Sequence, residues 1–295
     1  MKIPFEYTGG MGKEEWLLHR RKGIGGSDVA AILGLSPWVS PYQVWADKTG
    51  RVPIDLNSNE FEHWGTIMEP ILANEFEEQS HKKVFRQNKT FYDPKHPFLR
   101  ADIDRDVTGE EGFLEIKTAM EYKSDAWADD QIPAPYRLQV QHYMYVLNRP
   151  YCYFAYLIGG HRFGIKRYER DDELINQVEP QLIEWWDKHI IQDEAPDPDG
   201  SKSTTEILKL IYPKSEQIQV ELPSGWNAKL QRRQELKDNI KIIDENTKRT
   251  ENELRVAMGV GDTADTKNYH ITYRSNKNGN RMLRITERKN YDGKQ

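Results

Sequence analysis

The stretch from Phe98 to Thr118 carries the side chains whose types and spacing are best suited to chemistry. Asp104 ends one strand-like run, a turn follows at 107–112, and Glu115 and Lys117 alternate with apolar residues in a second run. A hairpin sets residues equally far from its turn opposite each other, so we expect Asp104 beside Glu115. Strand alternation puts Lys117 on the same face as Glu115, about 6.6–7 Å farther along. Two acids and one ammonium group are therefore predicted to converge.

Such a group of charges suits metal-dependent hydrolysis of a phosphodiester. A hard divalent cation such as Mg²⁺ prefers carboxylate and carbonyl oxygens and keeps part of its water shell. A nearby lysine orients the attacking water and balances the charge that develops on the phosphate. The competing interpretation is a solvated charged strand face, because similar triplets arise by chance on charged hairpins.

Two segments with helical spacing add polar side chains to this group. From His63 to Phe76 the apolar residues recur at helical intervals, which predicts a helix with Pro70 in or near its first turn. Glu69 on that helix either completes the metal site or is an ordinary acid favoured by the helix dipole. From Tyr136 to Tyr145 a second amphipathic helix carries Gln139 and Gln141, each one turn before a tyrosine. These amides either hold DNA phosphates and the site lysine or form a polar edge on a core helix.

A candidate phosphate site lies near the N-terminus. Arg20, Arg21 and Lys22 precede a glycine pair, and Ser27 then stands before an apolar segment as the expected N-cap of a helix. A helix N-terminus with arginines nearby favours phosphate binding. The segment is not a Walker loop, because Gly-Lys-Ser/Thr is absent.

Composition and charge restrict the class of protein. The chain has 295 residues, 37% of them hydrophobic and 11% aromatic, which is typical of a folded globular protein. Its net charge of −5 argues against coating nucleic acid by bulk charge. Its single cysteine, Cys152, excludes an intrachain disulfide framework and is expected to be a buried structural thiol. The histidines do not form a zinc-like cluster with it. No apolar run suits a membrane span or signal peptide, so we expect a cytoplasmic protein.

A break in composition at 193–205 divides the chain. We expect a core at 1–193, a linker at 194–205 and an extension at 206–295. Within the extension the pattern predicts a strand at 218–222, a long helix beginning near Trp226 and a basic hairpin at 269–286. The helix has an apolar seam from Leu236 to Ala257. Packing of this seam against the same chain is favoured over a self-associating coiled coil.

The order of these motifs resembles a known family. Residues 10–190 contain, in order, the motifs Trp16…Arg20…Ile24-Gly-Gly-Ser-Asp28, Trp64-Gly…Glu69-Pro70, Asp102-Ile-Asp104, Glu115-Ile-Lys117 and Gln139-Val-Gln141. This set is similar to the YqaJ-type viral recombinase nucleases, relatives of phage lambda exonuclease in the restriction-endonuclease-like PD-(D/E)XK superfamily. The C-terminal long helix and β-hairpin also resemble that group.

The resemblance implies an α/β fold with a central mixed β-sheet flanked by helices. It further implies a Mg²⁺-dependent 5′→3′ exonuclease on double-stranded DNA, with Mn²⁺ able to substitute. Its product would be 3′ single strands for a single-strand annealing recombinase in phage-type recombination. Relatives form toroidal trimers, so the resemblance also implies a homo-oligomer.

The resemblance assigns roles to individual residues. It implies metal ligands in Glu69, Asp104, Glu115 and the Ile116 carbonyl, with Lys117 positioning the attacking water. The other residues it implicates are Gln139 near the scissile phosphate, and Arg20 and Ser27 at the terminal 5′-phosphate. Gln141, two positions after Gln139, is expected from its amide to contact DNA.

The sequence departs from the family at Asp102, where a neutral residue is common, and at Arg105, where glycine commonly follows the metal aspartate. Asp102 either weakens 5′-phosphate binding or competes with Asp104 as a ligand. The remaining alternatives are a structure-specific or nicking endonuclease and a non-catalytic DNA-binding protein on the same fold. Intact Asp104, Glu115 and Lys117 count against the last.

Overall fold

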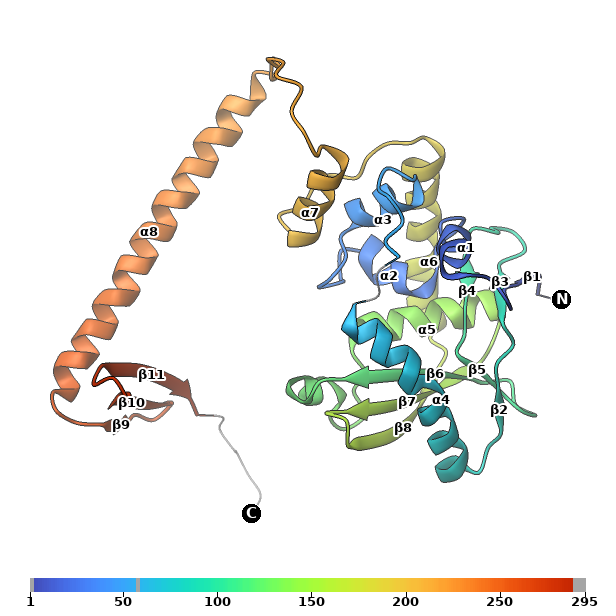
Figure 1. Ribbon diagram of the computed structural model, residues 1–295, viewed down its shortest axis with the longest axis horizontal. Coiled ribbons are helices and arrows are strands. Elements are labelled where there is room, and N and C mark those ends of the chain that lie inside the picture. Colours follow the sequence, from blue (N-terminus) through green and yellow to red (C-terminus); the bar gives the residue numbers. More distant parts are fainter. Residues whose placement is uncertain (1–2, 57–58, 289–295) are drawn as a thin grey trace. The chain divides into compact units, whose positions relative to one another are not determined.

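A computed structural model describes residues 3–56 and 59–288 of the chain. It forms two compact units, Met1–Ser215 and Glu216–Gln295 (Figure 1). The helices are α1 (Lys13–Arg20), α2 (Gly26–Ile32), α3 (Pro41–Lys48), α4 (Glu60–Ser80), η1 (Glu121–Trp127), α5 (Ala134–Leu147), α6 (Asp172–Trp186), η2 (Asp187–Ile191), α7 (Lys202–Ile211) and α8 (Gly225–Met258). The strands are β1 (Phe5–Tyr7), β2 (Val84–Phe85), β3 (Lys89–Tyr92), β4 (Arg100–Ala101), β5 (Arg105–Val107), β6 (Phe113–Ala119), β7 (Tyr151–Ile158), β8 (Arg162–Glu169), β9 (Thr263–Asp265), β10 (Tyr269–Ser275) and β11 (Arg281–Glu287). Among the residues described, none of these helices has the length and apolar content to cross a bilayer.

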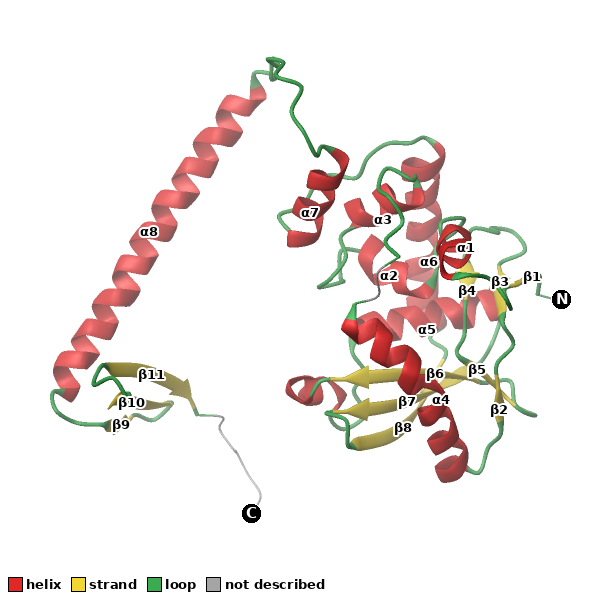
Figure 2. Ribbon diagram, in the orientation of Figure 1, coloured by secondary structure: helices red, strands yellow, loops and turns green. Residues whose placement is uncertain are grey.

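The first unit is built on a mixed sheet in the order β2-β5-β6-β7-β8 (Figure 2). β6 and β7 run parallel, and the other neighbours run antiparallel. Alternate residues of β6 enter two apolar clusters, Phe113 with Val140 of α5 and Leu114 with Phe76 of α4. Helices therefore cover both faces of the sheet, and the expected α/β class with a mixed sheet flanked by helices is confirmed.

The helix predicted at 63–76 is part of α4. Asn59 caps it by accepting a hydrogen bond from the backbone N–H of Glu62 at 2.9 Å. The expectation that Pro70 lies in or near the first turn is wrong, because Pro70 is in the helix interior. Of the apolar stripe, Leu72 and Phe76 are buried, whereas Trp64 is 59% exposed. Only the C-terminal half of α4 therefore packs into the core.

The predicted hairpin is formed by β5 and β6, with Arg105 paired to Leu114. The strand expected before it is interrupted. Its first part, β4, pairs with β3 in a separate three-stranded sheet, and residues 102–104 belong to no strand. The chain thus passes from one sheet to the next between Ala101 and Arg105, and Asp104 immediately precedes β5.

The N-cap of α2 is Gly25, so the prediction that Ser27 caps this helix is wrong. Asp28 takes over the capping interaction, because its Oδ2 accepts a hydrogen bond from the N–H of Gly25 at 3.0 Å. The Ser27 hydroxyl is thereby left to interact with a side chain outside the helix.

The expected linker does not end the first unit. α7 begins within it and packs near α3, where the N–H of Ser40 donates to Ser203 Oγ at 2.9 Å and Ile207 is buried. The division between the units falls after Ser215. Residues 218–222 form no strand, contrary to expectation, because no neighbouring strand pairs with them.

The second unit contains the predicted long helix and hairpin. α8 begins at Gly225, and β10 and β11 pair in register from Tyr269 with Glu287 to Ser275 with Arg281. The additional strand β9, which the sequence did not predict, pairs with β10.

The packing of α4 gives a first test. Phe76 is fully buried beneath the sheet at an interplanar angle of 52° to Tyr153, whereas Phe61 on the same helix is 71% exposed. Phe76→Ala should destabilise the protein by about 3–5 kcal/mol, because it removes a buried ring and leaves a cavity. Phe61→Ala, the matched control, should change the free energy of unfolding by less than about 0.5 kcal/mol. Equal effects in urea unfolding would contradict this packing.

Candidate active site

β6 and the turn before β5 bring the predicted acids and lysine together. Asp104 Oδ2 accepts a hydrogen bond from the backbone N–H of Ile116 at 2.7 Å, which fixes it against β6. Lys117 Nζ lies 2.6 Å from Glu115 Oε1. Glu115 is buried on a strand whose two faces are both covered. The competing interpretation of a solvated charged strand face therefore fails for this residue.

Helix α5 supplies the fourth member of the group. Gln139 donates from Nε2 to Glu115 Oε1 at 2.7 Å and lies 3.3 Å from the Tyr143 hydroxyl. Together with Lys117, it directs two donors at one oxygen of Glu115. Tyr136, on the same helix, places its ring 5.0 Å from Lys117 Nζ. Tyr136 was not predicted as a site residue, although its position one helical turn before Gln139 offered a signal.

Burial dominates the electrostatics of this group. Burial and the charge of Glu115 raise the pKa of Asp104 to about 8, and burial also raises the pKa of Glu115. Burial acts to lower the pKa of Lys117, but the carboxylates of Glu115 and Asp104 outweigh it and raise this pKa above its usual value. The ammonium group is therefore held in its charged form.

The donor set fits a hard divalent cation. Glu115 Oε2 is buried and has no hydrogen-bond partner within the described part of the chain, although an isolated carboxylate oxygen is costly to bury. Asp104 and Glu115 repel each other, which a cation between them would relieve. Carboxylate oxygens and a backbone carbonyl such as that of Ile116 are the ligands Mg²⁺ prefers.

Glu69 is paired with arginines, and its charge helps to raise the pKa of both Asp104 and Glu115. Its carboxylate forms an ion pair with Arg105, and Arg86 Nη2 lies 3.8 Å from its other oxygen. Arg105 also donates to the backbone carbonyl of Asp104 at 2.6 Å. Within residues 3–56 and 59–288, no three His, Cys, Asp or Glu side chains are grouped as a metal site. Asp102, the other residue at which the sequence departs from the family pattern, accepts a hydrogen bond from Thr90 Oγ1.

The predicted phosphate-binding residues adjoin the group through α2. Arg20 Nη2 donates to Ser27 Oγ at 2.7 Å, and Lys48 neutralises the neighbouring Asp28 at 2.7 Å. Gly26 packs directly on α5: a Cβ at this position would lie 2.6 Å from Gln139 Cγ. This close approach sets the Arg20–Ser27 pair beside the helix that carries Gln139.

Gln141 does not join the site, which corrects its expected role in DNA contact. It is buried, its Nε2 donates to the Glu169 carbonyl at 2.8 Å, and its Oε1 accepts from the N–H of Asp171 at 2.9 Å. Both ends of the amide therefore serve to fasten α5 to the segment between β8 and α6. Two positions along a helix place Gln139 and Gln141 on different faces.

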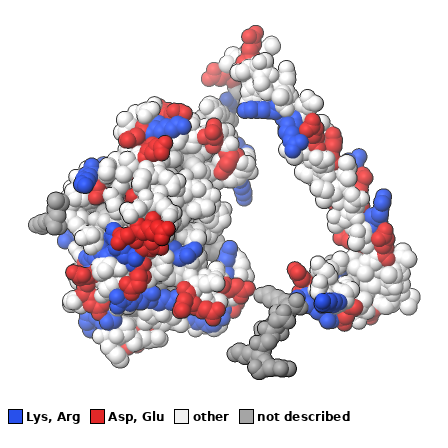
Figure 3. Space-filling model, turned by 180° about the vertical axis from the view of Figure 1, so that it is seen from behind, with Lys and Arg blue, Asp and Glu red and all other residues white. Residues whose placement is uncertain are grey.

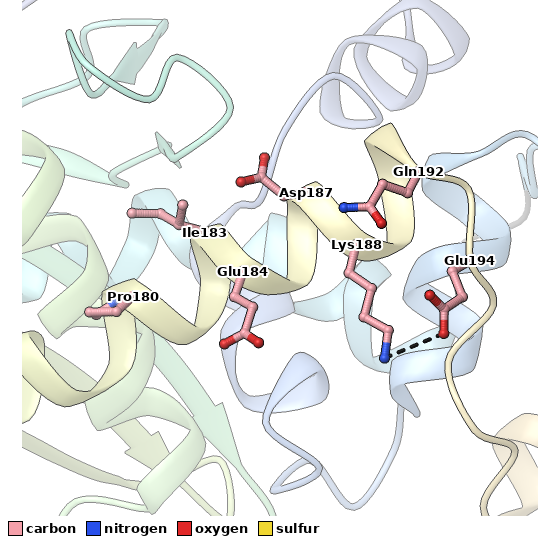
Figure 4. A pocket seen from close by; sticks show the side chains of 7 residues that line it. All are labelled: Pro180, Ile183, Glu184, Asp187, Lys188, Gln192 and Glu194. Atoms are coloured by element: carbon pink, nitrogen blue, oxygen red, sulfur yellow. Dashed lines mark ion pairs between the residues drawn. The ribbon is translucent and has the colours of Figure 1, made fainter.

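Two other features of the first unit, its cysteine and a surface hollow, do not belong to this candidate site. Cys152 is buried, as predicted, and burial raises the pKa of its thiol well above the usual value. A surface hollow lies along α6 and η2, where Lys188 and Glu194 form an ion pair at 3.4 Å (Figure 4). Its lining contains none of the predicted site residues: it consists of Pro180, Ile183, Glu184, Asp187, Lys188, Gln192 and Glu194.

Comparison with known proteins now identifies the family. Residues 15–150 match the model of the YqaJ-like viral recombinase domain. Protein YqaJ of Bacillus subtilis (strain 168) is 39% identical over 267 residues, which cover 90% of this chain and 84% of that protein. The chain belongs to the YqaJ family.

Two solved structures of one exonuclease have a fold similar to that of this YqaJ-family chain. The crystal structure of an alkaline exonuclease, LHK-Exo from Laribacter hongkongensis, matches with a TM-score of 0.50 and 20% identity, over 61% of this chain and 94% of that one. The same exonuclease in complex with dAMP matches with a TM-score of 0.50 and 22% identity over the same shares. The expected exonuclease-like fold is confirmed.

The raised pKa of Asp104 predicts a pH-dependent cost. Because the folded protein favours the protonated acid, ionisation destabilises it progressively as the pH rises from about 4, the usual pKa, towards 8. In EDTA, Asp104→Asn should therefore gain stability over wild type as the pH increases from 5 to 8. Each gain of 1 kcal/mol corresponds to a rise of about 2–4 °C in Tm. Thermal unfolding at both pH values measures this. A difference in Tm that does not grow with pH would contradict a raised pKa of Asp104.

Proposed function

We propose that this YqaJ-family protein is a Mg²⁺-dependent deoxyribonuclease that degrades double-stranded DNA from 5′ ends. The observation that carries the proposal is the convergence of Asp104, Lys117 and Gln139 on the buried Glu115, one of whose oxygens lacks a hydrogen-bond partner among the described residues. A buried glutamate beside a second acid is costly for stability, and acids with raised pKa values of this kind cluster at catalytic sites. The fold shared with an alkaline exonuclease supports the same reaction class.

The proposed ligands of Mg²⁺, for which Mn²⁺ would substitute, are Asp104, Glu115 and the Ile116 carbonyl. When bound, the cation would polarise the scissile phosphate and make water a better nucleophile. Glu69 is proposed as a further carboxylate of the site, and it would have to leave Arg105 to reach the cation.

Lys117 and Gln139 are proposed to act on the substrate. Lys117 is held between Glu115 and the Tyr136 ring as a charged donor, which suits it to orient the attacking water and balance charge on the phosphate. Gln139 holds Glu115 in place and offers its amide near the scissile phosphate.

Recognition of a DNA end is proposed for Arg20 and Ser27. A guanidinium and a hydroxyl 2.7 Å apart form a small cluster of donors suited to a terminal 5′-phosphate. Because α2 packs on α5 at Gln139, this cluster adjoins the proposed cleavage site. That arrangement favours an exonuclease over a nicking or structure-specific endonuclease.

The cellular setting is proposed from the family. The description of the matched domain as a viral recombinase supports a role in phage-type recombination, in which 3′ tails pass to a single-strand annealing recombinase. A cytoplasmic location and a homo-oligomeric assembly accord with this role.

Cleavage assays test the reaction. With Mg²⁺ and linear duplex DNA, Glu115→Gln and Lys117→Ala should each lower the rate by about 10²–10⁴-fold, because the first weakens a proposed Mg²⁺ ligand and the second removes the positive charge proposed to act at the reacting phosphate. Lys209→Ala is the matched control, since it also breaks a Lys–Glu pair, but one on the exposed surface of α7. Cutting of a closed circle would favour an endonuclease. No hydrolysis of any DNA with Mg²⁺ or Mn²⁺ would favour the non-catalytic DNA-binding protein.

End recognition has a separate test. Arg20→Ala should reduce the preference for 5′-phosphate over 5′-hydroxyl ends by about 10–100-fold, because it removes a charge-assisted hydrogen bond. Lys22→Ala controls for loss of a nearby exposed cation. An unchanged preference in the Arg20 variant would exclude the proposed 5′-phosphate contact.

A further inference from the structure

Helix α8 presents an apolar face that its own unit leaves open. None of its residues is buried, and Ile240 and Ile243 are 65% and 64% exposed. Within the described residues, the half-buried side chains of the seam region lie only near the C-terminal end of the helix, at Glu251, Leu254, Arg255 and Met258. An isolated helix with exposed isoleucines gains stability by packing against a partner.

The spacing along α8 defines the contact face. Successive steps of four and three residues connect the positions of the seam, listed from N- to C-terminus as Leu236, Ile240, Ile243, Thr247, Thr250, Leu254 and Ala257. Extended backwards, the same spacing reaches Arg233 and Lys229. This heptad pattern is typical of helices paired along their length.

Two cations at core positions decide the direction of pairing. In a parallel pair of identical helices, Arg233 and Lys229 would each face their own counterparts, and Arg232 would flank Lys237 of the other copy. Like charges in such positions are repelled. A parallel pair of α8 helices is therefore disfavoured.

An antiparallel pair removes these conflicts. If Ile240 faces Ile243 of the second copy, Leu236 faces Thr247, and Arg233 faces Thr250. The aliphatic stem of Arg233 can pack there while its charged end reaches solvent.

The same register pairs opposite charges beside the seam. Lys237 flanks Asp244 of the second copy, and Arg232 flanks Glu253. Each pair occurs twice because the arrangement is symmetric. Figure 3 shows charged side chains of both signs along α8, with Lys and Arg near its N-terminal end.

We propose that α8 pairs with α8 of a second copy of this chain in an antiparallel two-helix coiled coil centred between residues 241 and 242. The two nuclease units are thereby joined through their C-terminal extensions. The proposal does not depend on the activity proposed above, because it concerns only the face of α8.

Spin labels on full-length protein test the direction of pairing. The single native cysteine, Cys152, is buried, so a cysteine introduced at Gln231 or Asp238, on the side of α8 away from the seam, is the labelling site. From the helical rise, the two copies of residue 231 lie about 32 Å apart along the axis and those of residue 238 about 10 Å apart. The measured spin–spin distance should therefore be clearly longer for Gln231→Cys than for Asp238→Cys. Equal distances would indicate a parallel pair, and no coupling would indicate that α8 packs on its own chain or another partner; either result overturns the proposal.

Charge reversal tests the register. Lys237→Glu should weaken association at least about tenfold, because it replaces two attractive pairs with two repulsive ones. Lys237→Glu combined with Asp244→Lys should restore association. Lys241→Glu makes the same change in charge outside the seam and should leave association near wild type. Dissociation constants from sedimentation of full-length protein measure these effects, and failure of the double variant to recover would contradict the register.

Discussion

The burial of Glu115 beside Asp104 is the constraint on which the rest of the first unit depends. A carboxylate buried in the sheet beside a second acid is stable only if donors surround the two, because buried charge is costly without compensation. β6 supplies Lys117 and its own N–H at residue 116, and α5 supplies Gln139. The order of the strands and the position of α5 bring these donors together at Asp104 and Glu115.

The same constraint determines how closely α2 approaches. Gly26 packs against the side chains of Gln139 and Tyr143, each of which would lie 2.6 Å from a Cβ at this position. Any larger residue would push α2 away or displace Gln139 from Glu115. The lack of a side chain at Gly26 thus sets how closely the Arg20–Ser27 pair can approach Gln139 and, through it, Glu115.

Local patterns predicted the elements better than they predicted burial and partners. Strand alternation and turn length were enough to set Asp104 beside Glu115, because a hairpin register depends on nearby residues. They could not show that Glu115 is buried, since the covering helix is distant in sequence. Gln141 was misassigned for the same reason: its partners lie at 169–171, and helical spacing alone does not identify them. The N-cap at Gly25 was missed because Asp28 caps from within the helix.

Arg105 shows how one strand residue can change the charge beside the candidate site. Strand alternation directs Arg105 to the face opposite Asp104, where α4 presents Glu69, and the two side chains form an ion pair. Glycine at this position would leave Glu69 with Arg86 at 3.8 Å and would free its other oxygen. The hydrogen bond between Asp104 and the Ile116 N–H would persist, since it does not involve the Arg105 side chain. The residue after the aspartate therefore controls the charge around Glu69, which in turn helps to raise the pKa of Asp104 and Glu115. Its size and charge set how readily the α4 carboxylate can join that pair.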